Sequence, residues 1–387
     1  MCNPRVMLAV MAILLGQCPG ASPAEQANVP TTTLLRVAFS SPLRGVGLFE
    51  TASGATSGRC VLFTRPTHDA GTSFGPPGAP LSRSGCGNGE NLSRIAFTGT
   101  GLLIAYGPGL RVSRDLGATW AAPALAGAVA GMTAHGATSW VLSTRCRAGA
   151  RSCRLTLLRS GSAGSWAPVS PQPPDRAVSG AVTAEAETGE SNLLASAPDG
   201  APVLALPGPP PGGSRPGPRM ATVETLQPGA ARWTSSRVQC ATSYFETELS
   251  IAADGSEWLA CSDEPSTGAQ PKSLAVSPGR GKRWSLVAGP CVLGARCTQR
   301  MPIGGYLDGL VALSSRTGFY VGSRSSLTGT SDGGRSWHAW QRIGGQDNGT
   351  SQVTFAGPRY GWAIAQVDGG GAALWRTTNG GRTWSRA

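Results

Sequence analysis

Short apolar runs, separated by polar and glycine-rich segments, recur along most of the chain. Examples from two stretches are 94–97, 102–106, 110–112, 353–355, 361–365 and 373–375. Apolar runs of this length between turn residues are typical of β-strands, and no stretch shows the periodicity of an amphipathic helix. The 55 glycines and 30 prolines also suit a protein rich in turns. The pattern therefore predicts an all-β protein.

An eight-residue motif, here called the octet, follows the third run of each series. It reads SRDLGATW at residues 113–120, returns as TSDGGRSW at 330–337 and TTNGGRTW at 377–384, and has a phenylalanine variant, THDAGTSF, at 67–74. The carboxylate can accept hydrogen bonds from nearby backbone amides, the glycine can take a positive φ, and the aromatic ring can anchor the next strand. We therefore predict a structural turn, not a catalytic or metal site. The residues assigned to it are Thr67, Asp69, Gly71, Phe74, Ser113, Asp115, Gly117, Trp120, Thr330, Asp332, Gly334, Trp337, Thr377, Asn379, Gly381 and Trp384.

Weaker copies of the octet fill the gaps between the clear ones. Residues 277–284 have Gly279 at the aspartate position, and residues 159–166 and 226–233 keep little beyond the final tryptophan. The copies begin at 67, 113, 159, 226, 277, 330 and 377, and the longest step contains a Pro/Gly-rich insertion at 207–218. Such a repeat period is typical of β-propellers. We predict one propeller over residues 34–387 with seven four-stranded blades and an octet between strands 3 and 4; the weak copies leave six or eight blades as alternatives.

The octet resembles the Asp-box, or BNR, repeat of sialidase-like β-propellers. That group includes sialidases, xyloglucan-cleaving hydrolases, sortilin-type receptors and a photosystem II assembly factor. The resemblance extends over about residues 34–387. It implies the propeller fold, but it does not select one activity among those of the group.

In such a propeller the octets lie on one face, here called the octet face. The loops between strands 2 and 3 and the links between blades lie on the opposite face, here called the loop face. Eight cysteines follow residue 24, and their positions place four neighbouring pairs at the loop face. We predict the disulfides Cys60–Cys86, Cys146–Cys153, Cys240–Cys261 and Cys291–Cys297, although eight cysteines allow 105 connectivities. The chain has no Cys-x-x-Cys and only three scattered histidines, which argues against a zinc site.

The N-terminus has the order of a secretory signal. Arg5 precedes the apolar run 6–15, and small residues lead to Ala24. We predict a signal peptide over 1–24 and a short linker over 25–33, because the apolar run is too short to span a bilayer. An uncleaved anchor helix is one alternative. Lipidation at Cys18 is another, although Gln17 stands where lipoprotein signals have a small residue.

The net charge of +12 comes almost entirely from arginine, since Lys272 and Lys282 are the only lysines. A GC-rich genome would produce the same bias. An exported protein would not normally meet nucleic acid, so anionic glycans, lipid headgroups or proteins are the partners to consider. One segment, RCRAGARSCR at 145–154, concentrates the charge. The candidate binding residues at the loop face are Arg145, Arg147, Arg151, Arg154, Arg296 and Arg300.

Catalytic motifs are missing from the sequence. No residues match the arginine set, Tyr–Glu pair and acid/base Asp of sialidases, and the three histidines have no partners that would make a serine nucleophile. Asp263 and Asp368 fall near loops between strands 2 and 3, but their spacing does not pair them as glycosidase carboxylates.

We therefore expect an exported, monomeric, non-catalytic propeller without a cofactor. It would bind a protein, glycan or other anionic partner through the loop face. A sialidase-like glycoside hydrolase and an assembly factor resembling the photosystem II propeller are the alternatives.

Overall fold

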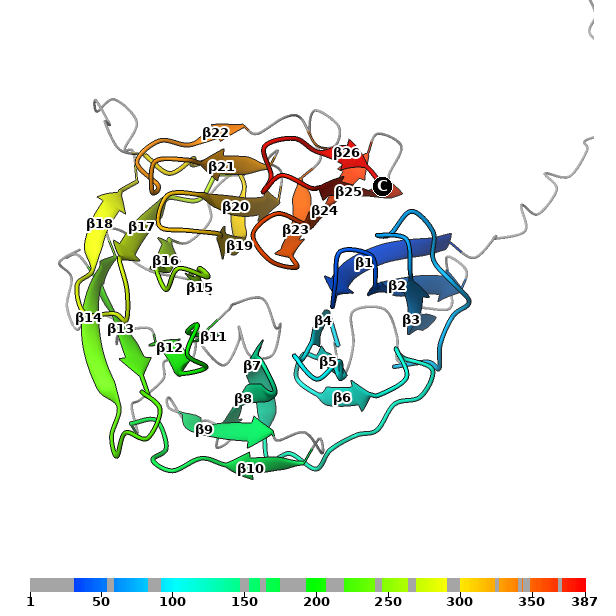
Figure 1. Ribbon diagram of the computed structural model, residues 1–387, viewed down its shortest axis with the longest axis horizontal. Helices are drawn as coiled ribbons and strands as arrows, with labels where there is room; N and C mark the ends of the chain where they lie inside the picture. Colours follow the sequence, from blue (N-terminus) through cyan, green and yellow to red (C-terminus); the bar gives the residue numbers. More distant parts are fainter. Residues whose placement is uncertain are drawn as a thin grey trace, which may run out of the picture.

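Seven antiparallel sheets follow one another around a ring in the computed structural model (Figure 1). The structure describes residues 31–53, 59–82, 92–146, 153–160, 165–174, 193–206, 219–240, 246–263, 269–290, 300–323, 327–339, 343, 349–367 and 371–387. All regular elements within these ranges are strands. The protein is thus a single seven-bladed β-propeller, as the octet spacing predicted.

Each blade consists of strands that are consecutive in the chain, with the first strand nearest the ring centre (Figure 1). Blade 1 contains β1 (Thr31–Phe39), β2 (Gly45–Ser53) and β3 (Arg59–Thr67); blade 2 contains β4 (Arg94–Phe97), β5 (Leu103–Tyr106) and β6 (Leu110–Ser113); blade 3 contains β7 (Ala128–His135), β8 (Thr138–Cys146), β9 (Cys153–Ser160) and β10 (Trp166–Pro168).

The remaining blades each have four strands. Blade 4 contains β11 (Leu194–Ser196), β12 (Pro202–Leu206), β13 (Arg219–Thr225) and β14 (Thr234–Cys240); blade 5 contains β15 (Glu246–Ile251), β16 (Glu257–Ser262), β17 (Lys272–Ser277) and β18 (Ser285–Ala288); blade 6 contains β19 (Tyr306–Ala312), β20 (Gly318–Ser323), β21 (Thr328–Thr330) and β22 (His338–Ala339); blade 7 contains β23 (Thr350–Phe355), β24 (Gly361–Val367), β25 (Gly371–Thr377) and β26 (Ser385–Arg386).

The fourth strand is reduced in the first two blades. A single antiparallel bridge, Leu62 to Ser82 in blade 1 and Val112 to Ala121 in blade 2, takes its place. The first strand also differs from expectation at its start: β1 begins at Thr31, so it includes residues 31–33, which the sequence analysis assigned to a linker.

The core is divided among the contacts between blades. Seven clusters of buried apolar side chains each join two neighbouring blades, and together they cover every contact around the ring. Both faces of a blade are therefore covered. This explains why second strands such as β5 and β12 are buried at every position instead of alternating between buried and exposed.

Side chains join blade 7 to blade 1 and close the ring. The amide group of Gln352 in β23 accepts a hydrogen bond from the Val37 amide at 2.7 Å and donates one to the Val37 carbonyl at 3.0 Å. The Trp362 indole stacks on Phe39, with ring centroids 3.5 Å apart, and donates a hydrogen bond to the Ala70 carbonyl at 2.8 Å. Among the described residues, no strand is shared between the first and last blades.

This closure predicts a stability difference between two tryptophans of blade 7. Trp362→Phe would leave the buried Ala70 carbonyl without its donor, and we expect a loss of about 1–3 kcal/mol in unfolding free energy. Trp375→Phe is the matched control, because the Trp375 indole nitrogen is buried without a hydrogen-bond partner among the described residues. Denaturant unfolding of both variants provides the measurement. Equal losses would contradict the closing role of the Trp362 hydrogen bond.

Candidate functional site

The octets form closely similar turns held by side-chain hydrogen bonds. In blade 2, Asp115 Oδ1 accepts from Ser113 Oγ at 2.7 Å and from the Thr119 amide at 2.9 Å, while Oδ2 accepts from Thr119 Oγ1 at 2.6 Å. Asp69 and Asp332 have the same set of partners in blades 1 and 6. Hydrogen bonds from the residue four positions later are the main cause that lowers the pKa of Asp69 and Asp115 to about 2.

Two consecutive residues of the octet have left-handed backbone. The fourth position has φ of 63° at Ala70, 58° at Leu116 and 54° at Arg280, and the glycine after it also has a positive φ. The glycine is constrained a second time by its neighbours. A Cβ on Gly71 would lie 2.5 Å from Leu374 of the preceding blade, and one on Gly381 would clash with Phe319 of its preceding blade. The octet is therefore both a hairpin turn and a contact between blades.

The weak octet copies occupy the same place in their blades as the clear ones. Residues 226–233 connect β13 to β14, residues 277–284 connect β17 to β18, and Trp166 opens β10. The regular spacing therefore identified turns that the local sequence alone did not.

The octet of blade 7 shows that an amide can replace the carboxylate. Asn379 Oδ1 accepts from Thr377 Oγ1 and from the Thr383 amide, each at 3.0 Å, and Nδ2 donates to Thr383 Oγ1 at 2.8 Å. The turn keeps its hydrogen bonds and loses one negative charge.

We expect Asp332→Ala to lower the unfolding free energy by about 1–2 kcal/mol, since three hydrogen bonds to the carboxylate would be lost. Asp332→Asn should cost much less, because Asn379 makes the equivalent bonds. Thermal unfolding compares the two. Equal losses in the two variants would mean that the negative charge, and not the hydrogen bonding, stabilises the turn.

A hollow of about 220 Å³ lies at the ring centre, lined mainly by the first strands of four blades. Its lining includes Arg36 of β1, Arg94 of β4, Tyr106 of β5 and Asp308 of β19, and Arg36 Nη1 donates a hydrogen bond to the Leu35 carbonyl at 2.9 Å. Arg94 opens β4, and first strands run from the loop face to the octet face. The lining also includes Val311 near the end of β19 and Thr354 near the end of β23, so the hollow extends along the channel.

A buried lysine fixes the chain beside this hollow. The Lys272 ammonium donates to the carbonyls of Gln270 and Gly305, each at 2.8 Å, and of Pro302 at 3.1 Å, and it lies 5.1 Å from the centre of the Tyr320 ring. Burial lowers the pKa of Lys272 to about 7, while the charges of Asp308 and Glu246 act to raise it. The carbonyl oxygens can only accept hydrogen bonds, so they favour the ammonium form. This contact holds the link that leads into β19.

The structure places three of the predicted binding arginines, and they do not form one cluster. Arg145 and Arg154 lie directly opposite each other across β8 and β9 of blade 3, and both are exposed. Arg300 is exposed in the link between blades 5 and 6, so blade 4 lies between it and blade 3. Arg147, Arg151 and Arg296 lie outside the described residues. The sequence analysis missed Arg36 and Arg94, whose one signal was an arginine within a predicted first strand.

One predicted disulfide is confirmed. Cys240 at the end of β14 is bonded to Cys261 in β16 and links blade 4 to blade 5, with Cα atoms 5.8 Å apart. Cys60 and Cys153 are also disulfide-bonded. The pairings 60–86 and 146–153 remain predictions. Cys86, Cys291 and Cys297 lie outside the described residues, as does the insertion at 207–218.

The structure gives no support to a pair of carboxylates at the predicted positions. Asp263 follows β16 and its amide donates to the Pro271 carbonyl, whereas Asp368 lies outside the described residues. In the part of the chain that the structure describes, no three His, Cys, Asp or Glu side chains are grouped so that they could hold a metal ion.

Glu257 is fully buried at the start of β16, close to the weak octet of blade 5. Neither of its carboxyl oxygens makes a hydrogen bond of ordinary geometry with the described residues, and only the neighbouring Gly281 amide favours the charged form. Burial raises the pKa of Glu257 from 4.5 to about 7.

This raised pKa predicts that stability falls as pH rises. Folding favours the protonated carboxyl, so its contribution is complete below about pH 4.5 and is lost as pH rises through 7. We expect a loss of about 2 kcal/mol in unfolding free energy between pH 5 and 7 that Glu257→Gln lacks. Denaturant unfolding at both pH values compares the variant with the unchanged protein. Parallel pH profiles would contradict a protonated Glu257.

The ring and its central hollow define the protein as a seven-bladed propeller with a ligand-sized opening lined by charged groups. The solved structures similar to it are propellers too. A structure described as YCF48 bound to D1 peptide is 17% identical, with a TM-score of 0.51 over 92% of this chain and 97% of the other. YCF48 from Cyanidioschyzon merolae is 15% identical, with a TM-score of 0.51 over 91% and 98%.

A third similar structure is the β-propeller domain of the trilobed protease from Pyrococcus furiosus, described as having an open velcro topology. It is 6% identical, with a TM-score of 0.53 over 92% of this chain and 97% of the other. At these identities the likeness concerns the fold alone. No protein-family model matches the chain, and no curated protein matches it. None of the described residues form a helix long and apolar enough to cross a membrane.

Proposed function

We propose that this protein is an exported, non-catalytic binding propeller that holds an acidic segment of a partner protein in its central channel. The observation that carries the proposal is the central hollow, where Arg36 and Arg94 come from two adjacent blades. Guanidinium groups bind carboxylates through paired hydrogen bonds.

Three further observations support this proposal. Arg145, Arg154 and Arg300 add positive charge at the loop face, which would attract an acidic partner. The YCF48 structure with a similar fold is described as bound to a peptide. The disulfide between Cys240 and Cys261 suits an oxidising compartment.

The two alternatives differ in what the hollow would have to supply. A glycoside hydrolase needs two carboxylates across a cleft, whereas Asp308 is the one carboxylate in the lining of the hollow. An assembly role would be a special case of peptide binding, in which the partner is a subunit that has not yet been incorporated into its complex.

The proposal is tested by titrating the protein with a synthetic Glu/Ala peptide in a calorimeter. We expect Arg94→Gln and Arg36→Gln each to weaken binding at least about tenfold, which corresponds to about 1.4 kcal/mol. Arg232→Gln, an exposed arginine in the blade 4 octet, is the matched control and should leave the affinity unchanged.

Unchanged affinity in both channel variants would overturn the proposal. So would turnover of a sialoside or β-glucan substrate that is lost in an Asp263→Asn/Asp368→Asn double variant, since that result would establish hydrolysis.

A further inference from the structure

The octet face has a hollow between neighbouring blades at three places described in the structure. Each is lined by the turn between strands 1 and 2 and by the octet or its weak copy. The hollow between blades 6 and 7 has a volume of about 640 Å³, that between blades 4 and 5 about 530 Å³, and that between blades 3 and 4 about 630 Å³. Because the three sites are equivalent in the repeat, their charges can be compared directly.

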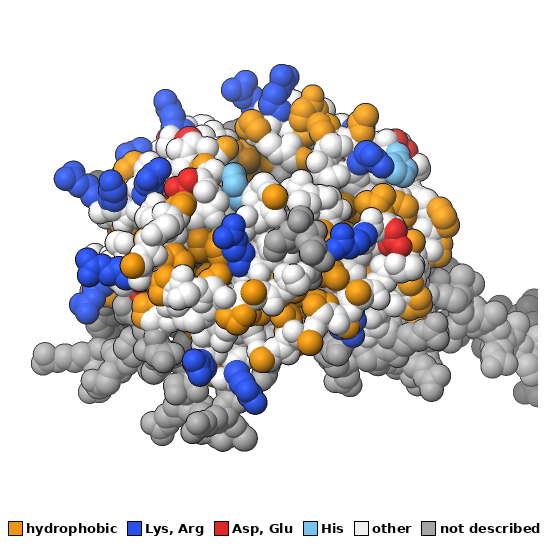
Figure 2. Space-filling view, turned by 60° about the horizontal axis from the view of Figure 1, so that its bottom comes forward, with side chains coloured by type: hydrophobic (Ala, Val, Ile, Leu, Met, Phe, Trp, Pro, Cys, Tyr) orange, Lys and Arg blue, Asp and Glu red, His pale blue; other side chains and the backbone are white. Residues whose placement is uncertain are grey.

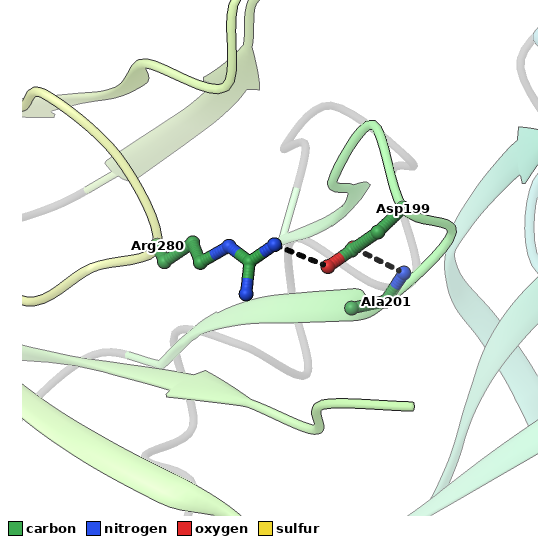
Figure 3. A network of polar contacts seen from close by, with 3 residues as sticks. All are labelled: Asp199, Ala201 and Arg280. Atoms are coloured by element: carbon green, nitrogen blue, oxygen red, sulfur yellow. Dashed lines mark hydrogen bonds and ion pairs between the residues drawn. The ribbon is translucent and has the colours of Figure 1, made fainter. Parts of the chain in front are cut away.

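Acidic side chains lie beside the basic ones in two of these hollows. Between blades 4 and 5, Arg280 and Lys282 face Asp199 and Asp254, and Arg280 forms an ion pair with Asp199 at 3.5 Å (Figure 3). Asp199 Oδ1 also accepts a hydrogen bond from the Ala201 amide at 3.1 Å, which fixes the carboxylate (Figure 3). Between blades 3 and 4, the same Asp199 lies in the lining with Arg159.

The hollow between blades 6 and 7, here called the 6/7 hollow, is different. Among the described residues, its lining contains Arg316, Arg359 and Arg382 and no Asp or Glu. All three arginines are exposed, and the side chains of Arg316 and Arg359 make no hydrogen bond or ion pair with the described residues. Three positive charges therefore gather around one hollow without a matching negative charge in its lining.

The turns between strands 1 and 2 produce this difference in charge. The turns of blades 4 and 5 contain Asp199 and Asp254, whereas those of blades 6 and 7 contain Arg316 and Arg359. The octet adds no charge in any of the three hollows, since Pro228, Gly279 and Asn379 stand where the clear octets have aspartate, and Asn379 lies in the lining of the 6/7 hollow. The Asn379 amide keeps the hydrogen bonds of the turn, so the charge is absent without a loss of bracing.

The backbone holds two of the arginines in equivalent positions. The Arg316 carbonyl accepts a hydrogen bond from the Gly333 amide at 2.8 Å, and the Arg359 carbonyl accepts one from the Gly380 amide at 2.9 Å. Each arginine is thus attached to the octet of its own blade. The turns therefore fix where each arginine leaves the backbone, so only its side chain has to be ordered when an anion binds.

We propose that the 6/7 hollow is a second binding site, on the octet face and separate from the channel hollow, for the carboxylates of an acidic peptide. Arginine pairs well with carboxylate oxygens, and Leu313 and Pro358 in the lining offer apolar contact for the aliphatic part of a glutamate side chain. This mixture of cationic and apolar groups suits a peptide better than a hydroxyl-rich glycan. Figure 2 shows many more Lys and Arg than Asp and Glu side chains on the surface in view, which would help to attract such a segment.

The sharpest test uses Asn379→Asp. This change introduces the residue found in three other octets, so the fold is retained, and it adds a negative charge to the 6/7 hollow. We expect it to weaken binding of a hexaglutamate peptide about three- to tenfold at low salt. The double variant Arg316→Ala/Arg359→Ala should weaken it more than tenfold. Arg280→Ala is the matched control and should have no effect, because Asp199 already balances that arginine.

The titrations are run with both the unchanged protein and the Arg94→Gln variant. This distinguishes peptide binding at the 6/7 hollow from peptide binding at the channel hollow. If Asn379→Asp weakens hexaglutamate binding in the Arg94→Gln background, the result supports the second site. This holds even if the titrations contradict binding at the channel hollow. No effect of Asn379→Asp, with thermal unfolding unchanged, would overturn it. Tighter binding of a sulfated oligosaccharide than of hexaglutamate, with the same response to the variants, would overturn the assignment to a peptide.

Discussion

The contact on which the rest of this structure depends is the one between each octet glycine and the blade before it. A β-blade cannot bury two apolar faces alone, and its neighbours must cover both. The octet sets this spacing, because the glycine that allows the reversal also leaves room for a side chain of the preceding blade, such as Leu374 beside Gly71. Turn geometry and packing between blades therefore select the same residue.

The contact between blades 7 and 1 differs from the others, since the two ends of the described chain must be held together by side chains. Gln352 satisfies both backbone groups of Val37, and Trp362 packs its ring on Phe39 while its indole nitrogen reaches the Ala70 carbonyl. Ala70 belongs to the first octet. The motif that supports each blade thus also receives the closing hydrogen bond, and the closure needs no additional element.

Much of the fold could be predicted from the sequence because the octet recurs once in every blade. The spacing alone located the turns at 226–233 and 277–284, where the local pattern is weak, and the assignment of faces led to the confirmed pair Cys240–Cys261. Distances across the ring could not be predicted in this way. Arg36 and Arg94 come from different blades, yet both line the same hollow. Arg145 and Arg300 were expected to lie near each other, yet they lie in blade 3 and in the link between blades 5 and 6. Which first strands meet at the channel depends on how the ring closes, and local periodicity does not contain that information.

The structure also separates two properties of the octet aspartate that the sequence pattern combines. Its oxygens hold the turn, and its charge contributes to the potential of the octet face. Asn379 supplies the hydrogen bonds without the charge, while Asp69, Asp115 and Asp332 supply both. The charge of a hollow can therefore change from blade to blade while the ring stays the same. A repeat built for packing can in this way carry a binding site at one position and a balanced, purely structural surface at the next.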